Sequence, residues 1–248
     1  MVSSYELADI NRGKSLTSIK NSIPYLQILT TPTILGIWIG AVGCLLALQL
    51  MQMFSPLYIR EVLQYSVQKT GFAAALPVLF QCLVKVVAGY SSDQIRSISE
   101  TTKLRIYNSV SLGASALAFC ALAFVKKGES ICGIVLITLA TAMFGLIGAG
   151  FVKCATLVSR QHSHFVLANI QNIWCSTMLI CPVVVSFLLP TGAMEEWRAV
   201  FLIHAGLLLL SNAVFCWLAT AKPAPWTDSS ITTSSKKNTP MISWGFTV

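Results

Sequence analysis

Charged residues are scarce in this chain of 248 residues. They make up 10% of the sequence, whereas hydrophobic residues make up 55%. Soluble domains carry roughly 25% charged residues. So few charges cannot cover so much apolar surface in water, so the composition excludes an ordinary soluble domain and indicates an integral membrane protein.

Sequence signatures of catalysis and metal binding are also absent. The chain contains no His-Glu-x-x-His, no Gly-x-Ser-x-Gly and no glycine-rich phosphate loop ending in Lys-Ser or Lys-Thr. Its eight cysteines form no Cys-x-x-Cys pair. Nearly all of them lie inside apolar runs, where cysteine behaves as a small apolar residue. We therefore predict no enzyme, no cofactor and no metal site.

The basic residues behind the net charge of +8 are not arranged in a pattern typical of nucleic-acid binding. Basic residues are scattered singly through polar segments, without a basic stripe or interleaved aromatic residues. The first 30 residues hold no continuous apolar stretch, so a cleaved signal peptide is not expected. The basic residues instead fit the cytosolic side of a membrane protein.

The sequence does contain six long apolar runs separated by short polar joints. They cover roughly residues 33–54, 71–91, 104–125, 131–152, 164–189 and 197–219. Each can cross a bilayer as a helix, which needs about 20 apolar residues. Lipid offers no partner to an unpaired backbone group, and the runs are too long for barrel strands. The sequence therefore predicts an all-α membrane protein with a six-transmembrane-helix bundle.

Three segments are expected along the chain. Residues 1–32 form a cytosolic N-terminal segment, residues 33–220 the transmembrane domain, and residues 221–248 a disordered cytosolic tail rich in Ser, Thr and Lys. Six crossings place both termini on one side of a multi-pass protein. Most basic residues lie in the termini and in the second and fourth joints, which favours cytosolic termini. The plasma membrane and an endolysosomal or vesicular membrane both stay open.

Lys85 stands out because it lies inside the second apolar run. A charge at the centre of a bilayer costs about 2.5–3.5 kcal/mol, and such residues usually face the protein interior. Gln81 lies one turn before Lys85 and Gly89 one turn after it, so the three share a helix face. Two interpretations stay open. Lys85 binds an anionic substrate or pairs with a carboxylate, or its long side chain carries the ammonium to the interface.

Further polar candidates lie in the first and fifth runs. Gln49 and Gln52 are three residues apart in the first run, and Asn169 and Asn172 are three apart in the fifth. Amides at this spacing either line an aqueous pathway or form hydrogen bonds from helix to helix. We keep both interpretations for these four residues.

Glycines recur in the first and fourth runs. They are Gly36, Gly40 and Gly43, and Gly145, Gly148 and Gly150. Small residues at helix–helix contacts allow two backbones to approach closely. We expect tight packing there, which is compatible with flexible helices in a transporter that rocks between two states.

The joint after the second run reads AGYSSDQIRS. It resembles the loop motif of the major facilitator superfamily through Gly89, Asp93 and Arg96. Three further segments strengthen the resemblance: SPLYIREVL at residues 55–63, EEWRAVF at 195–201 and APW at 224–226. Together, over roughly residues 24–226, they resemble the second half of an anion:cation symporter. That family includes sodium-phosphate cotransporters, sialin and vesicular glutamate transporters.

The resemblance implies a fold, a function and partners. It implies one six-helix half of a transporter, with substrate bound between two halves. It implies secondary transport of an inorganic or organic anion such as phosphate, coupled to Na⁺ or H⁺, by alternating access. Gly89, Asp93 and Arg96 would form a cytosolic gating motif. The implied partners are a small anion, the coupling cation, the bilayer, and either a second six-helix bundle or a second copy of the chain.

Two departures from the family pattern bear on this function. Residues 156–162 read TLVSRQH, where the family commonly has an Asn…Asp…Ala-Pro stretch. Cys44 stands where the glutamate-carrying branch places an arginine, so the resemblance does not imply glutamate as the substrate. The alternative function is a non-transporting membrane scaffold, or a degenerate half-transporter, that binds membrane partners.

Overall fold

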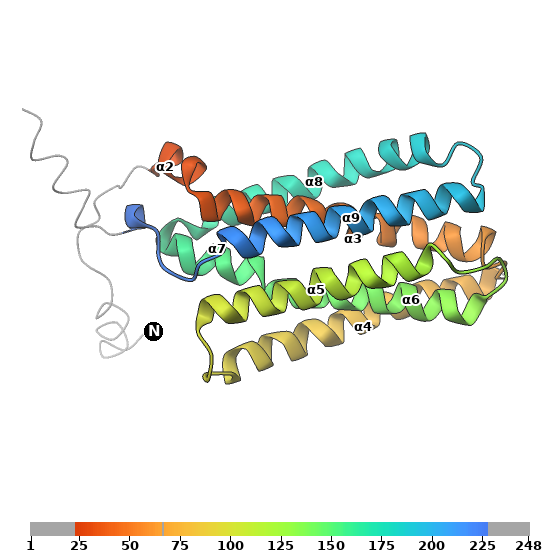
Figure 1. Ribbon diagram of the computed structural model, residues 1–248, viewed down its shortest axis with the longest axis horizontal. Helices are drawn as coiled ribbons and strands as arrows, with labels where there is room; N and C mark the ends of the chain where they lie inside the picture. Colours follow the sequence, from red (N-terminus) through yellow and green to blue (C-terminus); the bar gives the residue numbers. More distant parts are fainter. Residues whose placement is uncertain (1–22, 66, 228–248) are drawn as a thin grey trace, which may run out of the picture.

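The computed structural model describes residues 23–65 and 67–227, and for 67–70 and 130 it describes the backbone alone. Every regular element in this part of the chain is a helix. The elements are α2 (Tyr25–Thr30), α3 (Pro32–Glu61), α4 (Val67–Gln94), α5 (Glu100–Leu122), α6 (Ser130–Met143), η1 (Phe144–Gly148), α7 (Phe151–Ser159), η2 (Arg160–His162), α8 (Ser163–Leu188), α9 (Met194–Leu218) and η3 (Pro225–Thr227). The fold is therefore an all-helical bundle in the described residues (Figure 1).

Each predicted apolar run corresponds to a helical segment, but two differences are informative. α3 continues through Pro56 to Glu61, into residues expected to form a joint. The fourth run does not form one uninterrupted helix. α6 ends at Met143, a 3₁₀ turn follows to Gly148, and α7 then runs through residues expected to form the next joint. Closely spaced glycines each weaken an α-helix by about 1 kcal/mol, which explains a break at this place.

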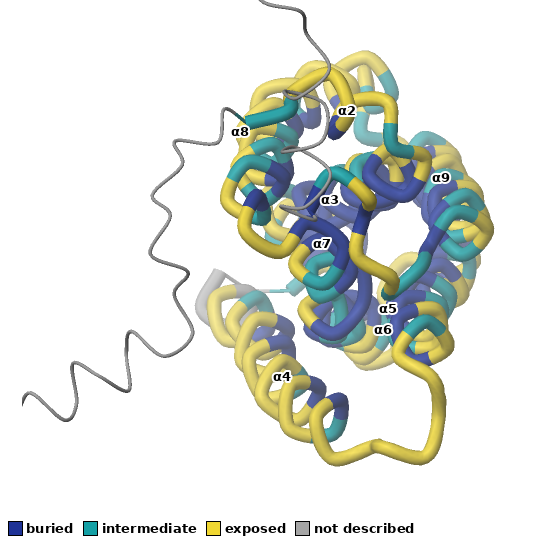
Figure 2. Tube along the Cα trace, turned by 90° about the vertical axis from the view of Figure 1, so that its left-hand side faces the viewer, coloured by how far each residue is buried: buried dark blue, intermediate teal, exposed yellow. Residues whose placement is uncertain are grey.

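α3 lies at the centre of the bundle and α4 at its edge. In their apolar stretches, 72% of the residues are buried in α3 but only 22% in α4. Figure 2 shows α3 and α7 in the interior, with α8 on one side of them and α4 on the other. α8 packs on α3 and α7, whereas α4 packs on α6, η1 and α3. α4 and α8 therefore carry more exposed large apolar side chains than the other helices in the described residues.

Glycine allows α3 to approach α9 closely. A Cβ atom on Gly43 would overlap the hydroxyl of Ser211 and lie 2.7 Å from the Ser211 Cβ. A Cβ atom on Gly36 would lie 2.8 Å from the Cβ of Leu218. Both distances are shorter than a carbon–carbon contact allows, so these positions of α3 require glycine.

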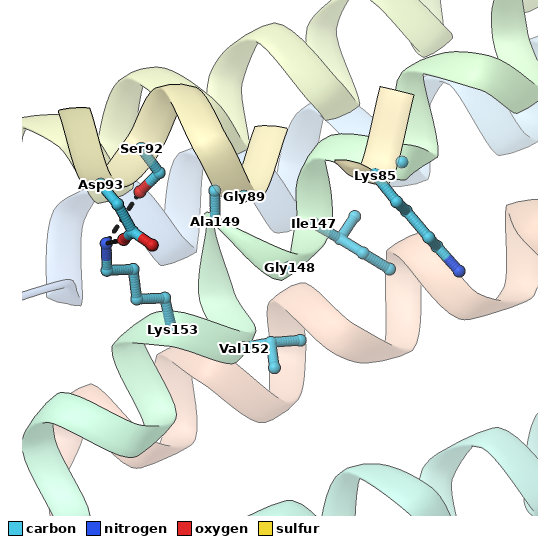
Figure 3. A pocket seen from close by; sticks show the side chains of 10 residues that line it. Lys85, Gly89, Ser92, Asp93, Ile147, Gly148, Ala149, Val152 and Lys153 are labelled. Carbon is cyan, nitrogen blue, oxygen red and sulfur yellow. Dashed lines mark hydrogen bonds and ion pairs between the residues drawn. The ribbon is translucent and has the colours of Figure 1, made fainter. Parts of the chain in front are cut away.

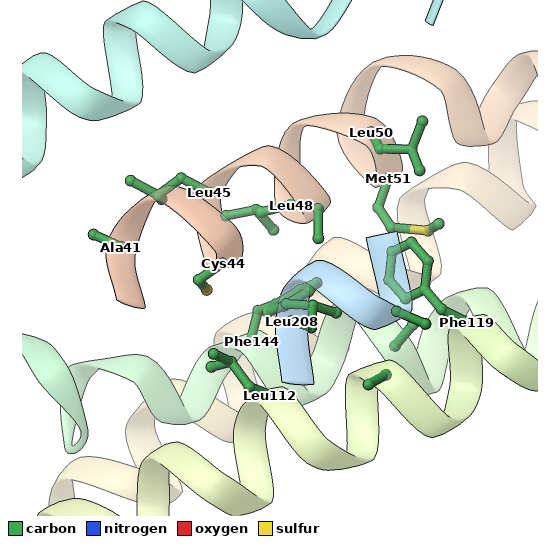
Figure 4. Close-up of a cluster of buried hydrophobic side chains, with 14 of the residues drawn as sticks. Ala41, Cys44, Leu45, Leu48, Leu50, Met51, Leu112, Phe119, Phe144 and Leu208 are labelled. Atoms are coloured by element: carbon green, nitrogen blue, oxygen red, sulfur yellow. The ribbon is translucent and has the colours of Figure 1, made fainter. Parts of the chain in front are cut away.

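The core is packed with aliphatic and aromatic side chains from α3, α5, η1 and α9 (Figure 4). The ring of Tyr58 lies 5.1 Å from the rings of both Trp197 and Phe201, edge to face. Phe119 joins this group from α5 at 6.0 Å from Phe201. Edge-to-face aromatic contacts of this kind add stability beyond the burial of their area.

α5 carries polar side chains that form hydrogen bonds with its neighbours. Ser111 and Ser115 donate to the carbonyl oxygens of Met143 (2.8 Å) and Ala140 (2.9 Å) on α6. Asn108, fully buried, donates from Nδ2 to Oδ1 of Asn212 on α9 at 2.9 Å. These donors bond within the protein, so they do not need water, whereas Oδ1 of Asn108 has no hydrogen-bond partner in the described residues.

Four segments of the described residues are long and apolar enough to cross a membrane: Pro32–Glu61, Gly71–Gln94, Ile131–Leu188 and Met194–Leu218. The third contains 58 residues and folds back on itself between α7 and α8 (Figure 1). α5 is not among the four, since Arg105, Asn108 and several serines make it more polar. Long apolar helices thus mark the chain as a membrane protein.

α3 begins and α9 ends at the same end of the bundle, where the Thr33 hydroxyl donates to the Leu218 carbonyl at 2.9 Å. We call this end the terminal end. The joint between α4 and α5 also lies there (Figure 1). Beyond α9 the chain stays against the bundle as far as Thr227. Residues 1–22 and 228–248, which hold most of the two predicted cytosolic segments, lie outside the described residues.

Candidate binding cavity and charge cluster

A cavity of about 480 Å³ lies between α4 and the break that separates α6 from α7. Its lining residues are Lys85, Gly89, Ser92, Asp93, Gly145, Ile147, Gly148, Ala149, Val152 and Lys153 (Figure 3). At Gly145 the break touches α4, because a Cβ atom there would lie 2.7 Å from the Gln81 carbonyl oxygen. Gly148 has no neighbour within 4 Å of such an atom. The missing side chain at Gly148 thus leaves the space open.

Lys85 reaches the cavity from α4 with an exposed side chain. No hydrogen bond or ion pair joins its ammonium to any residue that the structure describes. Figure 3 shows this side chain directed away from Asp93 and Lys153, which lie further along α4 and on α7. Lys85 lies nine residues before the end of α4, or roughly 14 Å along the helix axis. An unpaired ammonium at this depth can attract an anion.

Asp93 forms an ion pair with Lys153, at 3.1 Å from Oδ1 to Nζ. Lys153 also donates to the hydroxyl of Ser92 at 2.8 Å, so one side chain of α7 holds two consecutive residues of α4. Lys103 donates to the Ser92 carbonyl oxygen at 3.2 Å and forms an ion pair with Glu100 at 2.5 Å. Two lysines therefore join the last turn of α4 to α5 and α7 at the terminal end.

The residues of the predicted gating motif separate in the structure. Gly89 and Asp93 line the cavity, whereas Arg96 is exposed in the joint and has no hydrogen bond or ion pair within the described residues. Lys153 holds Asp93 instead. Sequence reasoning placed Lys153 only in a joint. The available signal was its position directly after the glycine cluster, and nothing in the sequence pointed to a partner 60 residues away.

The other polar candidates do not line the cavity. Gln81 is buried, and its Nε2 has no hydrogen-bond partner among the described residues. Gln49 is buried within α3, while Gln52 is exposed. On α8, Asn172 is exposed, and half-buried Asn169 donates to the Phe165 carbonyl of its own helix at 2.9 Å. The structure brings Lys85, Gly89 and Asp93 together and leaves these five amides elsewhere.

The amino-acid sequence of the chain is similar to those of several known proteins. The chain is 27% identical over 83% of its length to the uncharacterized transporter slc-17.2 of Caenorhabditis elegans. It is 22% identical over 84% of its length to human sialin, and 26% identical over 75% of its length to mouse vesicular glutamate transporter 2. It covers 42%, 43% and 32% of these three relatives, which is less than half of each. No family model matches the chain.

The resemblance found in the sequence is confirmed by these relatives. The chain is homologous to the family that contains sialin and the vesicular glutamate transporters. Its relatives are named as transporters, not as enzymes.

Proposed function

We propose that this chain is one six-helix half of a secondary transporter that moves a small inorganic or organic anion by alternating access. The homology supports the transport class. The phosphate-like character of the anion and its coupling to Na⁺ or H⁺ come from the resemblance described above. The alternating access would arise from rocking of two six-helix bundles against each other.

The observation that carries this proposal is the unpaired ammonium of Lys85 in the cavity. The lining contains two lysines and one carboxylate. Asp93 compensates Lys153, so Lys85 leaves the cavity with a net positive charge. In an apolar surrounding this charge is screened less than in water, and an anion of matching size would stabilise it.

The proposal includes a sidedness, which rests on the basic residues in the termini and in the second and fourth joints. We assign six membrane crossings to α3, α4, α5, α6 with α7, α8 and α9, and we place the terminal end in the cytosol. The ion pair of Asp93 and Lys153 would then hold α7 against α4 on the cytosolic side, next to Gly89. Breaking this pair would open the cavity to the cytosol. Arg96 would lie beside this gate without a part in its closing contact.

The second half would pack on one of the two exposed edges of the bundle, which are formed by α4 and by α8. Large apolar side chains point outward from both helices, among them Phe72, Leu79 and Val86 on α4, and Leu179 and Phe187 on α8. Either a second six-helix bundle or a second copy of this chain fits such an edge. The alternative function, a scaffold that binds membrane partners without transport, would use the same surface.

The proposal is tested by uptake into liposomes that contain the purified chain. We expect uptake of phosphate or an organic anion under a Na⁺ gradient or a proton gradient. Lys85→Gln should lower the uptake rate at least about tenfold, since it removes the charge that binds the anion, whereas Lys85→Arg should retain most of it.

Lys126→Gln serves as the matched control, because Lys126 lies in the exposed joint between α5 and α6. Equal uptake by the Lys85→Gln and Lys126→Gln variants would show that Lys85 does not bind the anion. No uptake under either gradient, together with crosslinking to an unrelated membrane protein alone, would favour the scaffold.

A further inference from the structure

The nine residues after α9, Ala219 to Thr227, run across the terminal end of the bundle. We call this segment the clasp. It is attached to α5 at its start, because Arg105 Nη2 donates to the Ala219 carbonyl at 2.9 Å. The backbone N–H of Ala221 donates to the Thr101 hydroxyl at 3.0 Å. The clasp therefore begins as a fixed continuation of α9 along the neighbouring helix.

The middle of the clasp covers α7. The thiol of Cys154 donates to the Thr220 carbonyl at 3.4 Å, and the backbone N–H of Ala224 donates to the Val158 carbonyl at 3.0 Å. Cys154 and Val158 are one helical turn apart, so both contacts lie on one face of α7. Cys154 is fully buried there.

The end of the clasp reaches the entry to α3 and the turn after α7. Trp226 donates from Nε1 to the Thr31 hydroxyl at 2.9 Å, and its ring lies 5.8 Å from that of His162. The side-chain amide of Gln161 donates to the Thr227 carbonyl at 2.8 Å. One short segment thus bridges α5, α7, η2 and the start of α3.

α7 is a separate helix, and an irregular backbone conformation interrupts the chain at each of its ends. At its start the 3₁₀ turn and Gly150 (φ −91°, ψ −117°) interrupt the helix. At its end Arg160 has a φ of +41°, which a residue with a side chain rarely adopts. The backbone of α7 is thus not continuous with α6 or α8, and its packing on α3 and α8 together with side-chain contacts decides its position.

Besides its packing on α3 and α8, α7 is held by two sets of polar contacts. Lys153 ties it to α4, as described above. Cys154 and Val158 tie it to the clasp. We propose that the clasp is a detachable strap that locks α7 in the position seen here, and that its release uncovers Cys154 and frees the terminal end of α7.

The native thiols report on this release. The full chain in detergent is treated with N-ethylmaleimide, and the modification rate of each cysteine is followed by mass spectrometry. Trp226→Ala removes the contacts to Thr31 and His162, and we expect it to raise the rate at Cys154 about tenfold. Thr31→Val removes the acceptor of the Trp226 hydrogen bond, together with a local bond from the Thr31 hydroxyl to the Gln27 carbonyl, but keeps the ring contact with His162, and it should give a smaller rise in the same direction.

Cys44 and Trp217 supply the internal control and the control variant. Cys44 is fully buried in α3 and should stay unmodified. Trp217→Ala changes an exposed side chain of α9 outside the clasp and should leave Cys154 protected. An unchanged rate at Cys154 in the Trp226→Ala variant, or equal rises at Cys154 and Cys44, would overturn the proposal. The labelling needs no transport, so a failed uptake experiment leaves this test intact.

Discussion

At the residue scale, the ion pair of Asp93 and Lys153 is expected to matter for gating and to contribute little to folding stability. The side chains are 78% and 25% exposed, respectively. Exposed pairs of this kind contribute about 0–1 kcal/mol to folding, since water screens them. The pair therefore matters because it connects α4 to α7, a helix whose backbone is interrupted at both ends.

Asp93→Asn should change transport more than stability. We expect the unfolding free energy to fall by less than about 1 kcal/mol, and anion uptake to fall at least about fivefold because α7 loses its ion pair with α4 and keeps only the hydrogen bond from Lys153 to Ser92. Thermal unfolding in detergent and uptake into liposomes measure the two effects. The matched test is the charge exchange Asp93→Lys with Lys153→Asp, which should restore uptake. Uptake that stays as low in the exchanged pair as in Asp93→Asn would contradict the assignment of the gate.

At the element scale, the contact between α3 and α9 depends on glycine. Gly43→Ala places a methyl group onto the hydroxyl of Ser211 and next to its Cβ. Insertion of a methyl group into a packed contact costs about 1–3 kcal/mol, so we expect this variant to lower the unfolding free energy by that amount.

Gly206→Ala is the matched control within α9. A Cβ atom at Gly206 has no neighbour within 4 Å, and alanine favours a helix over glycine by about 1 kcal/mol. Gly206→Ala should leave stability unchanged or raise it slightly. Similar melting temperatures for Gly43→Ala and Gly206→Ala would show that α3 and α9 are not in this close contact.

The sequence predicts the helices well and the cavity only partly. Long apolar runs specify helices because lipid leaves the backbone no other partner. Lys85 was grouped with Gly89 because residues four apart lie on one helix face, and Gly89 with Asp93 through the loop motif. The break at residues 144–150 was missed because an apolar run with glycines can form either a continuous or an interrupted helix. Lys153 was missed because its contacts depend on how α7 packs against α4.

At the scale of the whole molecule, the helices divide into a buried centre and two exposed edges. α3 is surrounded by other helices, while α4 and α8 carry outward apolar side chains. This division suits a bundle that has lipid on one side and a second bundle on another. The chain covers less than half of slc-17.2 and of sialin, and in the proposal the second bundle corresponds to the rest of their length.

α5 decides whether the bundle crosses the membrane six times. Its polar residues keep it out of the group of four candidate spans, yet Ser111, Ser115 and Asn108 bond to neighbouring helices. These bonds pair the side-chain donors of α5 within the bundle, which favours its entry into a bilayer, although Oδ1 of Asn108 has no hydrogen-bond partner among the residues that the structure describes. The account therefore predicts that the joints before and after α5 lie on opposite faces of the membrane.

Site-directed labelling of these two joints tests the central claim most directly. A cysteine is introduced at Ser97, before α5, or at Lys127, after it, in a chain whose native cysteines are replaced. Each variant is expressed at the cell surface, and intact cells are treated with a maleimide that cannot cross membranes. The account predicts labelling at position 127 from outside, and at position 97 only after the membrane is opened. Labelling of both positions from the same face would show that α5 does not cross, and would contradict the six-helix transporter half.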